Sequence, residues 1–203
     1  TLNLLEGGVI NNIEADAPGG VVNITGGVVE QTIDASSISA AISVVAGTLN
    51  ASDAIVWSDT KTAIELVASN DSRSALNLNN SFVSGAGDAI KVAKSDAVLT
   101  ATHVVGVAGA GGTGVGVQTG GSNLRIEDNS LIEGERVGLT VTNSGAIPNT
   151  GILPPPDVVM IDHSTVVGHF GPAIELFDRY NAPAIATVTL QNNTELVTGN
   201  GNL

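Results

Sequence analysis

Short alternating pairs of aliphatic residues, each separated by one position, recur along the whole chain. This spacing has a period of two, whereas a helical stripe would need apolar positions three and four residues apart. A period of two is typical of short strands that bury one face. The first set of pairs is Leu2/Leu4, Val22/Ile24, Leu49/Ala51, Leu76/Leu78, Leu99/Ala101, Leu124/Ile126, Val159/Ile161 and Val188/Leu190.

A second set of pairs follows the first at a nearly constant distance. The offset between the sets is 14 to 16 residues in five units and 20 in the earliest, whereas the distance on to the next unit ranges from 7 to 20. Stacked coils vary in this way when two sides stay in register and one corner is free to change length. The second set is Ile42/Val44, Ile64/Leu66, Ile90/Val92, Val115/Val117, Leu139/Val141 and Ile174/Leu176.

These repeats predict an all-β fold, a parallel β-helix of about eight coils that forms a single domain over residues 1–203. A unit of about 25 residues is too short for a propeller blade, and the chain lacks the consensus of leucine-rich repeats. Successive coils would stack at about 4.8 Å, so that inward residues form continuous aliphatic ladders. We expect one ladder to contain Leu76, Leu124 and Val159 and another to contain Ile90, Leu139 and Ile174.

The composition agrees with short strands and tight turns, and it narrows the range of partners. The chain has 25 Gly, 42% hydrophobic residues and only 2% aromatic residues. Its net charge of −13 repels phosphate backbones, so we expect no nucleic-acid partner. Cysteine is absent, so the core must stabilise the fold without disulfides. The chain contains no run of 18 apolar residues, so the sequence predicts no transmembrane helix.

The sequence GAGD at 85–88 is the strongest local candidate for a calcium loop or a phosphate cradle. In the calcium-binding repeat Gly-Gly-x-Gly-x-Asp, one residue separates the last glycine from the aspartate, whereas Asp88 directly follows Gly87. A phosphate loop would continue into Gly-Lys-Ser/Thr, which is absent here. Aligned copies carry glycine at Gly87, Gly112 and Gly171, and the position of Asp88 is taken by Thr113, Val137 or Pro172. We therefore interpret GAGD as a corner between two strands.

Parallel β-helices also include enzymes that cleave polysaccharides with clustered carboxylates, and one region of this chain has suitable groups. Two carboxylates with a histidine and an arginine can serve acid–base cleavage. Asp162, however, aligns with Asn79, Thr102 and Glu127 of other units. His163 likewise aligns with Asn80, His103 and Asp128. These alignments indicate ordinary turn positions that face outward. The spacing of the three histidines also fits no metal site, so we expect no catalysis, no metal and no cofactor. The residues considered are Asp157, Asp162, His163, His169, Asp178 and Arg179.

Two insertions, 143–157 and 177–184, depart most from the repeat. Both leave the variable corner, one coil apart, and carry apolar, proline and aromatic residues where a solvated loop is expected. Tyr and Arg are enriched where binding energy concentrates. We therefore name these loops as the candidate partner-binding surface, against the alternative that they only cover the flank of the stack. The candidate residues are Ile147, Ile152, Leu153, Pro154, Pro155, Pro156, Phe177, Asp178, Arg179 and Tyr180.

The segments SALNLNNSFVSGAGDAIKVAKSDAVLTATHVVGVAGAGGTGVGV (74–117) and NLRIEDNSLIEGERVGLTV (123–141) resemble the passenger domains of pertactin-type autotransporters. The shared form is an aliphatic strand, an Asn/Ser turn, a Val/Ile-x-Gly step and an Ala-Ile or Gly-Leu strand, and it covers nearly all of 22–198. The resemblance implies a right-handed β-helix that is exported through the periplasm and an outer-membrane β-barrel to the bacterial cell surface. The chain would then be part of a longer passenger, with the barrel on a further C-terminal segment. No Arg-Gly-Asp triplet is present, unlike in some adhesive passengers.

From these observations we expect a non-catalytic surface module that acts as an adhesin. Its partner would be a host surface protein or glycan, or another copy of the chain. The alternative is a carbohydrate-active β-helix, either a polysaccharide lyase or hydrolase or a phage tail spike. An enzyme needs carboxylates clustered on one regular face, whereas an adhesin can place its contacts on loops, and the sequence favours loops.

Overall fold

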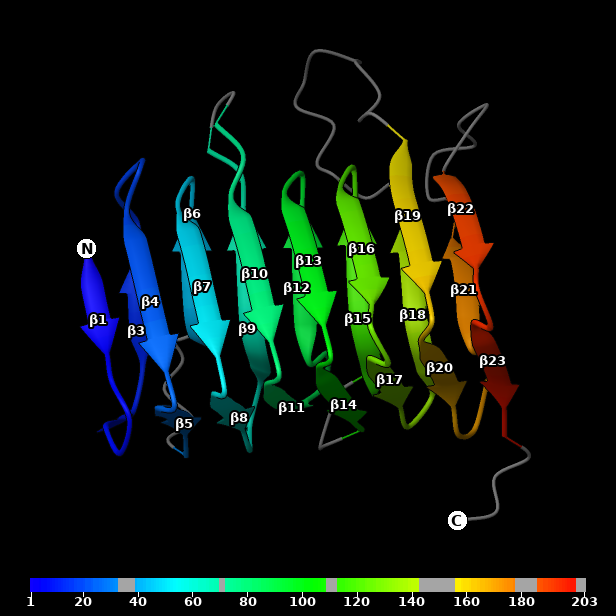
Figure 1. The fold of residues 1–203 in the computed structure, drawn as a ribbon, viewed down its shortest axis with the longest axis horizontal. Helices are drawn as coiled ribbons and strands as arrows, with labels where there is room; N and C mark the ends of the chain where they lie inside the picture. Colours follow the sequence, from blue (N-terminus) through cyan, green and yellow to red (C-terminus); the bar gives the residue numbers. More distant parts are fainter. Residues whose placement is uncertain (33–38, 70–71, 109–112, 143–155, 178–185, 200–203) are drawn as a thin grey trace.

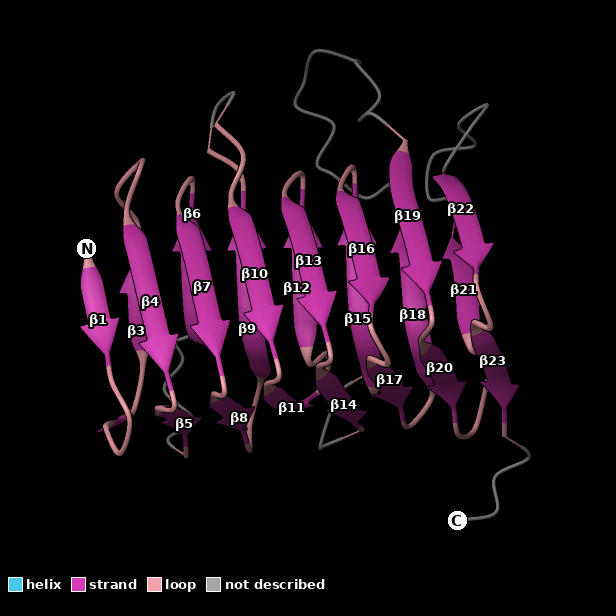
Figure 2. Cartoon of the chain, in the orientation of Figure 1, coloured by secondary structure: helices cyan, strands magenta, loops and turns pink. Residues whose placement is uncertain are grey.

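The computed structural model describes residues 1–32, 39–69, 72–108, 113–142, 156–177 and 186–199. These residues form three parallel sheets and no helix, so none of them provides a helical membrane span (Figure 2). The first sheet contains β1 (Leu2–Leu4), β4 (Val21–Thr25), β7 (Thr48–Ser52), β10 (Ala75–Asn79), β13 (Asp96–Thr100), β16 (Asn123–Glu127), β19 (Asp157–Asp162) and β22 (Ala186–Gln191).

The other two sheets follow the same order along the chain. The second sheet contains β2 (Val9–Ile10), β5 (Val28–Gln31), β8 (Ile55–Ser58), β11 (Phe82–Ala86), β14 (His103–Val107), β17 (Leu131–Gly134), β20 (Thr165–Gly168) and β23 (Glu195–Thr198). The third sheet contains β3 (Ile13–Ala15), β6 (Ala40–Val45), β9 (Thr62–Val67), β12 (Ile90–Ala93), β15 (Val115–Gly120), β18 (Val137–Thr142) and β21 (Ile174–Phe177).

One strand from each sheet makes one coil, and successive coils stack along the long axis of the molecule (Figure 1). The first-sheet strands run in front and the third-sheet strands return behind them, which winds the chain in a right-handed sense from the N-terminus to the C-terminus. The first two sheets have eight strands each. The predicted right-handed parallel β-helix of about eight coils is therefore confirmed.

The register confirms both predicted ladders. Leu76 pairs with Ala97, which pairs with Leu124, and Leu124 pairs with Val159. On the third sheet, a second ladder joins Ile64, Ile90, Val117, Leu139 and Ile174. Most members of these ladders are fully buried and belong to one continuous aliphatic core. Stacking of like side chains in every coil is the main source of stability for a chain without disulfides.

The pairs predicted for the coil that starts at β13 are wrong by two residues. The register places Ala97/Leu99 and Val117/Thr119 at the inward positions, in place of Leu99/Ala101 and Val115/Val117. Because Ala97 is small, the hydrophobic pattern favoured the pair that begins two residues later, at Leu99. Because Thr119 is polar, the pattern favoured the pair that begins two residues earlier, at Val115. The segment between these strands is accordingly longer than the prediction assumed.

The corner between the first and second sheets is made by a left-handed residue in each coil. The backbone φ there is 47° at Asn80, 49° at Ala101, 56° at Asp128 and 44° at His163. Asn and Asp adopt this conformation at a lower cost than most side chains do. The correct equivalents of His163 are therefore Ala101, Asp128 and Asn80, and Asp162 lies level with Thr100 and not with Thr102.

The corner between the second and third sheets depends on glycine. A Cβ on Gly134 would lie 1.7 Å from the carbonyl oxygen of Val137, and one on Gly106 would lie 2.0 Å from that of Val115. Gly85, which begins GAGD, has the same role, and Gly87 has a φ of 130° that L side chains rarely adopt. GAGD is thus a corner, as predicted.

Asp88, at the end of that corner, is more than a neutral turn residue. It is buried, accepts a hydrogen bond from the Thr113 hydroxyl and pairs with Lys91, whose Nζ lies 3.3 Å from Oδ2. Its equivalent in the next coil is Val115, because Ile90 pairs with Val117, and not Thr113. Gly112 lies outside the described residues.

The corner that returns from the third sheet to the first carries a ladder of buried hydroxyls, which we call the serine ladder. The Ser74 amide donates to Ser95 Oγ (3.4 Å), and the Ser95 amide donates to Ser122 Oγ (3.3 Å). The Ser122 amide donates in turn to Asp157 Oδ1 (2.8 Å). The insertion 143–157 ends with Asp157, the first residue of β19, and 177–184 begins with Phe177, the last residue of β21. The insertion residues 143–155 and 178–184 lie outside the described part of the chain.

Candidate functional site

Most of the predicted partner-binding residues lie outside the part of the chain that the structure describes. These are Ile147, Ile152, Leu153, Pro154, Pro155, Asp178, Arg179 and Tyr180. The two described members are both exposed: Pro156 directly precedes β19, and Phe177 ends β21 with 52% of its surface accessible. Phe177 is also part of a groove, which makes it the most informative of the predicted residues.

This groove, which we call the third-sheet groove, lies over the outward face of β15, β18 and β21. Its volume is about 490 Å³, within the range of about 300–1,000 Å³ that is usual for small-molecule sites. Its polar floor is one cross-strand row, in which Gln118 pairs with Thr140 and Thr140 pairs with Glu175. The lining residues are Thr113, Val115, Gln118, Arg136, Val137, Thr140, Phe170, Gly171, Pro172, Glu175 and Phe177.

Two phenylalanines flank this row. Phe170 lies in the corner before β21 and Phe177 at its end, and about half of each side chain is exposed. The whole chain has only five aromatic residues, three Phe, one Tyr and one Trp, so two in one groove is a marked concentration. Aromatic residues, phenylalanine among them, are enriched at binding surfaces, where each ring can bury a large apolar area.

Thr140 is the unusual polar group of the groove. Its side chain is only 6% exposed, and its Oγ1 has no hydrogen-bond partner. An unpaired buried hydroxyl costs roughly 1–3 kcal/mol, so a fold retains one rarely without compensation. Alternation along β18 places Leu139 and Val141 inward, which directs Thr140 to the groove.

The carboxylates that the sequence analysis considered for acid–base cleavage, and set aside, are dispersed. Asp157 and Asp162 stand at opposite ends of β19, about 16 Å apart at the usual rise of a strand. Glycosidases that retain or invert configuration place their carboxylates about 5–9.5 Å apart. Asp162 accepts a hydrogen bond from Asn192 (2.9 Å) and lies 3.1 Å from His163 Nδ1, which makes it part of the outer turn. Asp178 and Arg179 lie outside the described residues.

Asp157 itself is the last member of the serine ladder, at the position that Ser122 occupies one coil earlier. Its side chain is fully buried, Oδ1 accepts the Ser122 amide, and Oδ2 has no partner. Burial raises the pKa of the Asp157 carboxyl from 3.8 to about 6, against the smaller lowering effect of the Ser122 amide and nearby donors. The Asp157 carboxyl therefore does not face solvent, and its role is to hold the corner between the third and first sheets by accepting the Ser122 amide.

The second histidine considered for acid–base cleavage, His169, belongs to a different arrangement that sequence reasoning missed. The carboxylate of Glu133 on β17 contacts His103 Nε2 at 2.5 Å and His169 Nε2 at 3.1 Å. His103 and His169 lie diagonally on opposite sides of Glu133, in the preceding and following coils. The three side chains therefore link three successive coils through side-chain contacts. Among the described residues no group of His, Cys, Asp or Glu converges as a metal site.

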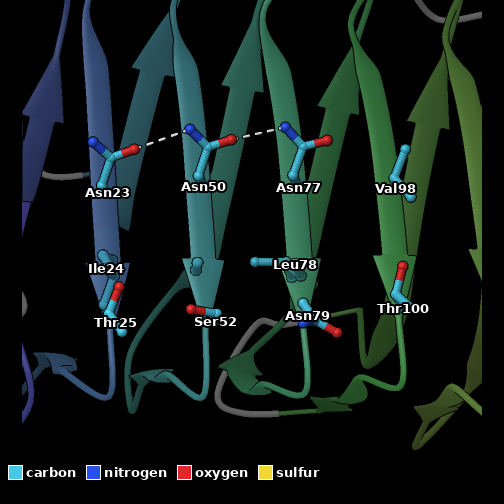
Figure 3. Close-up of a pocket in the computed structure, with 11 residues that line it drawn as sticks. Asn23, Ile24, Thr25, Asn50, Ser52, Asn77, Leu78, Asn79, Val98 and Thr100 are labelled. Carbon is cyan, nitrogen blue, oxygen red and sulfur yellow. Dashed lines mark hydrogen bonds between the residues drawn. The ribbon is translucent and has the colours of Figure 1, made fainter.

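A second groove, of about 540 Å³, lies on the first sheet over β4, β7, β10 and β13. Figure 3 shows its central row, which we call the asparagine ladder: the Asn50 amide donates to Asn23 (3.0 Å) and the Asn77 amide donates to Asn50 (2.8 Å). The ladder starts at Asn3, which accepts from Asn23, and ends where Val98 takes the next position. Each interior amide is satisfied by its neighbours, so this row stabilises the stack.

Sequence reasoning found Phe177 but not Gln118, Arg136, Thr140 or Phe170. Their signal was available in the alternation of the strands, because the residues between inward aliphatics face outward. The two-residue error in the coil from β13 hid this signal. With Val115/Val117 as the inward pair, Gln118 no longer lies beside Thr140 and Glu175.

Comparisons with protein-family models, with curated proteins and with solved structures found no match for the chain.

Proposed function

We propose that the chain is a non-catalytic binding module, part of the passenger of a pertactin-like autotransporter on the bacterial cell surface. It acts as an adhesin toward a host surface protein or glycan, or toward another copy of itself. The resemblance of 74–117 and 123–141 supports the export route, and the absence of cysteine is compatible with it. Ligand binding is assigned to the third-sheet groove and, from the sequence, to the insertions 143–157 and 177–184.

One observation carries this proposal: the third-sheet groove gathers two of five aromatic residues around a polar row on an otherwise regular solenoid. Structural ladders explain the asparagine and serine rows on the other faces. Buried polar atoms without a partner also occur outside the groove, at Gln31, Thr60, Thr119 and Asp157, but only the groove combines such an atom with two exposed aromatic rings among the described residues. The groove has no such explanation, since Thr140 has no partner and Phe170 and Phe177 contribute little burial. Groups that do not serve the fold are candidates for binding.

The arrangement of carboxylates supports a binding role over the carbohydrate-cleaving alternative. Among the described residues that line the third-sheet groove, Glu175 is the one carboxylate. Cleavage of a glycosidic bond by the usual mechanisms needs two carboxyl groups on either side of the bond.

The experiment compares binding of the purified chain and a groove variant to host epithelial cells and to immobilised copies of the chain. We expect Phe177→Ala to weaken binding by at least about tenfold, since loss of an aromatic hot-spot contact costs about 2 kcal/mol or more. Phe82→Ala is the matched control, because Phe82 is a partly exposed phenylalanine on the second sheet, packed against His103. Equal effects of the two substitutions, or no binding by the intact chain, would contradict the proposal.

A further inference from the structure

We propose that the third-sheet groove binds a neutral oligosaccharide. This inference rests on the proposed function, since it names the ligand of the same groove. It follows from four features of the described lining residues: the hydrogen-bonding row, the flanking aromatic rings, the unpaired hydroxyl and the balance of charge.

The floor offers hydrogen-bonding groups of mixed character at regular spacing. Gln118 has an amide that both donates and accepts, Thr140 a hydroxyl that does the same, and Glu175 a carboxylate that accepts. They stand on three adjacent strands, so their backbones are about 4.8 Å apart. Sugar hydroxyls also both donate and accept, and they line the edge of a chain at close intervals, so the row suits them better than it suits an apolar ligand.

Phe170 and Phe177 provide apolar contacts at the two ends of this row. The face of an aromatic ring carries partial negative charge and packs against weakly positive C–H groups. The ring of a pyranose presents such C–H groups on its faces and hydroxyls around its rim. A groove with aromatic ends and a polar floor matches both features, and Pro172 adds a further apolar side beside Phe170.

The Thr140 hydroxyl gives the groove a specific need for a polar ligand. It is almost fully buried and has no partner, so the free protein carries the cost of its desolvation. Its Oγ1 is enclosed by protein atoms, so a ligand hydroxyl reaches it only when the side chains of the groove shift, and it then restores one hydrogen bond. An aliphatic ligand would leave the cost in place.

The charge argues for a neutral ligand of limited size. Arg136 and Glu175 bring one charge of each sign to the groove, and the chain as a whole has a net charge of −13. An acidic polysaccharide would be repelled by that field. A protein partner needs an interface of about 1,200–2,000 Å² in total, whereas a groove of about 490 Å³ is of the size that holds a small molecule.

The test screens the purified chain against an array of short linear gluco-, manno- and galacto-oligosaccharides, with oligogalacturonates and sialylated glycans as acidic probes. The best neutral probe is then titrated by calorimetry. We expect Thr140→Val to weaken binding about three- to tenfold without lowering the melting temperature, because valine keeps the shape and removes an unpaired group. Phe177→Ala should weaken it at least about tenfold, and the controls Phe82→Ala and Asn50→Ala should leave it unchanged.

The outcomes separate this inference from the proposed function. Preference for the acidic probes, or binding that survives both groove substitutions, would overturn the inference. Binding to host proteins or to other copies of the chain without binding to any glycan would overturn the inference and leave the proposed function standing. Release of shorter oligosaccharides would support the glycan groove and overturn the non-catalytic function.

Discussion

The asparagine ladder on the first sheet and the third-sheet groove are both outward faces of the same solenoid, yet they treat polar groups in opposite ways. In the ladder, Asn23, Asn50 and Asn77 satisfy one another at intervals of 27 residues. In the groove, Thr140 has no partner and two phenylalanines stand half exposed. A regular repeat gives each side chain an identical neighbour in the next coil, and so leaves little for a ligand to satisfy.

The serine ladder shows the same contrast within a single row. Ser74, Ser95 and Ser122 each accept one amide from the neighbouring coil and return a hydrogen bond to a backbone carbonyl. Asp157 keeps the accepting role but adds a second buried oxygen that nothing satisfies. The irregular part of the molecule thus begins where the spacing rises to 35 residues. Departures from the repeat, in spacing and in residue type, coincide.

The largest expected effect tests the glycine corner that the regular and irregular regions share. Gly134→Ala should lower the free energy of unfolding by about 4 kcal/mol or more, because its Cβ would overlap the Val137 carbonyl oxygen and backbone must move. Gly85→Ala, in the regular region, should cost less, since the nearest atom to its Cβ, the Asp88 carbonyl oxygen, would lie at 2.8 Å. Denaturant unfolding of both variants measures this. Equal and small losses would show that the corner is not closed by glycine.

The second effect concerns Asp157. Its raised pKa means that the folded state holds the proton more tightly than the unfolded state, so stability is lost as pH rises from 3.8 to about 6. Above pH 6 the cost is of the order of 3 kcal/mol. Asp157→Ser restores the ladder residue and should raise stability by up to about that amount at pH 7.

The gain from Asp157→Ser should shrink steadily as the pH falls from about 6 through 3.8, because the carboxyl is protonated in both states only at still lower pH. Unfolding curves of wild type and variant at a series of pH values provide the measurement, and Asp157→Asn is the control that keeps the size of the side chain. A gain that does not change with pH would mean that the buried charge is not its source.

The smallest effect tests whether the asparagine ladder is self-sufficient. Asn50→Ala removes two inter-coil hydrogen bonds at a partly exposed site and should cost about 1 kcal/mol. Val98→Asn would extend the ladder by one coil, since Val98 pairs with Asn77, and should gain a few tenths of a kcal/mol. Thermal melts of both variants measure the difference. Loss of stability on extension would show that the row does not act as a ladder.

The fold could be predicted because alternation and spacing are properties of the sequence alone. Leu76, Leu124, Ile90 and Leu139 were placed in the correct ladders because each is aliphatic at an inward position. The prediction failed at Ala97 and Thr119, where burial is imposed by the register and not by hydrophobicity. A pattern of apolar residues carries no information where an inward position holds a small or polar side chain.

The site was less predictable for a physical reason. Phe177 could be recognised by its residue type, but Thr140 looks like any strand threonine until the register shows it buried without a partner. Likewise, Asp157 and Asp162 are close in sequence and lie at opposite ends of one strand. Glu133 joins His103 and His169 across 30 and 36 residues, a relation that only stacking creates.

Because every coil contacts only its neighbours, we expect the molecule under mechanical tension to unfold one coil at a time from the end that is pulled. A force that pulls on one end acts on a single coil, whose three strands separate from the next coil before anything deeper is loaded. A coil of 27 residues would release about 90–97 Å of extended chain. A tether at a moving interface could in this way lengthen in steps while the remaining coils keep their shape.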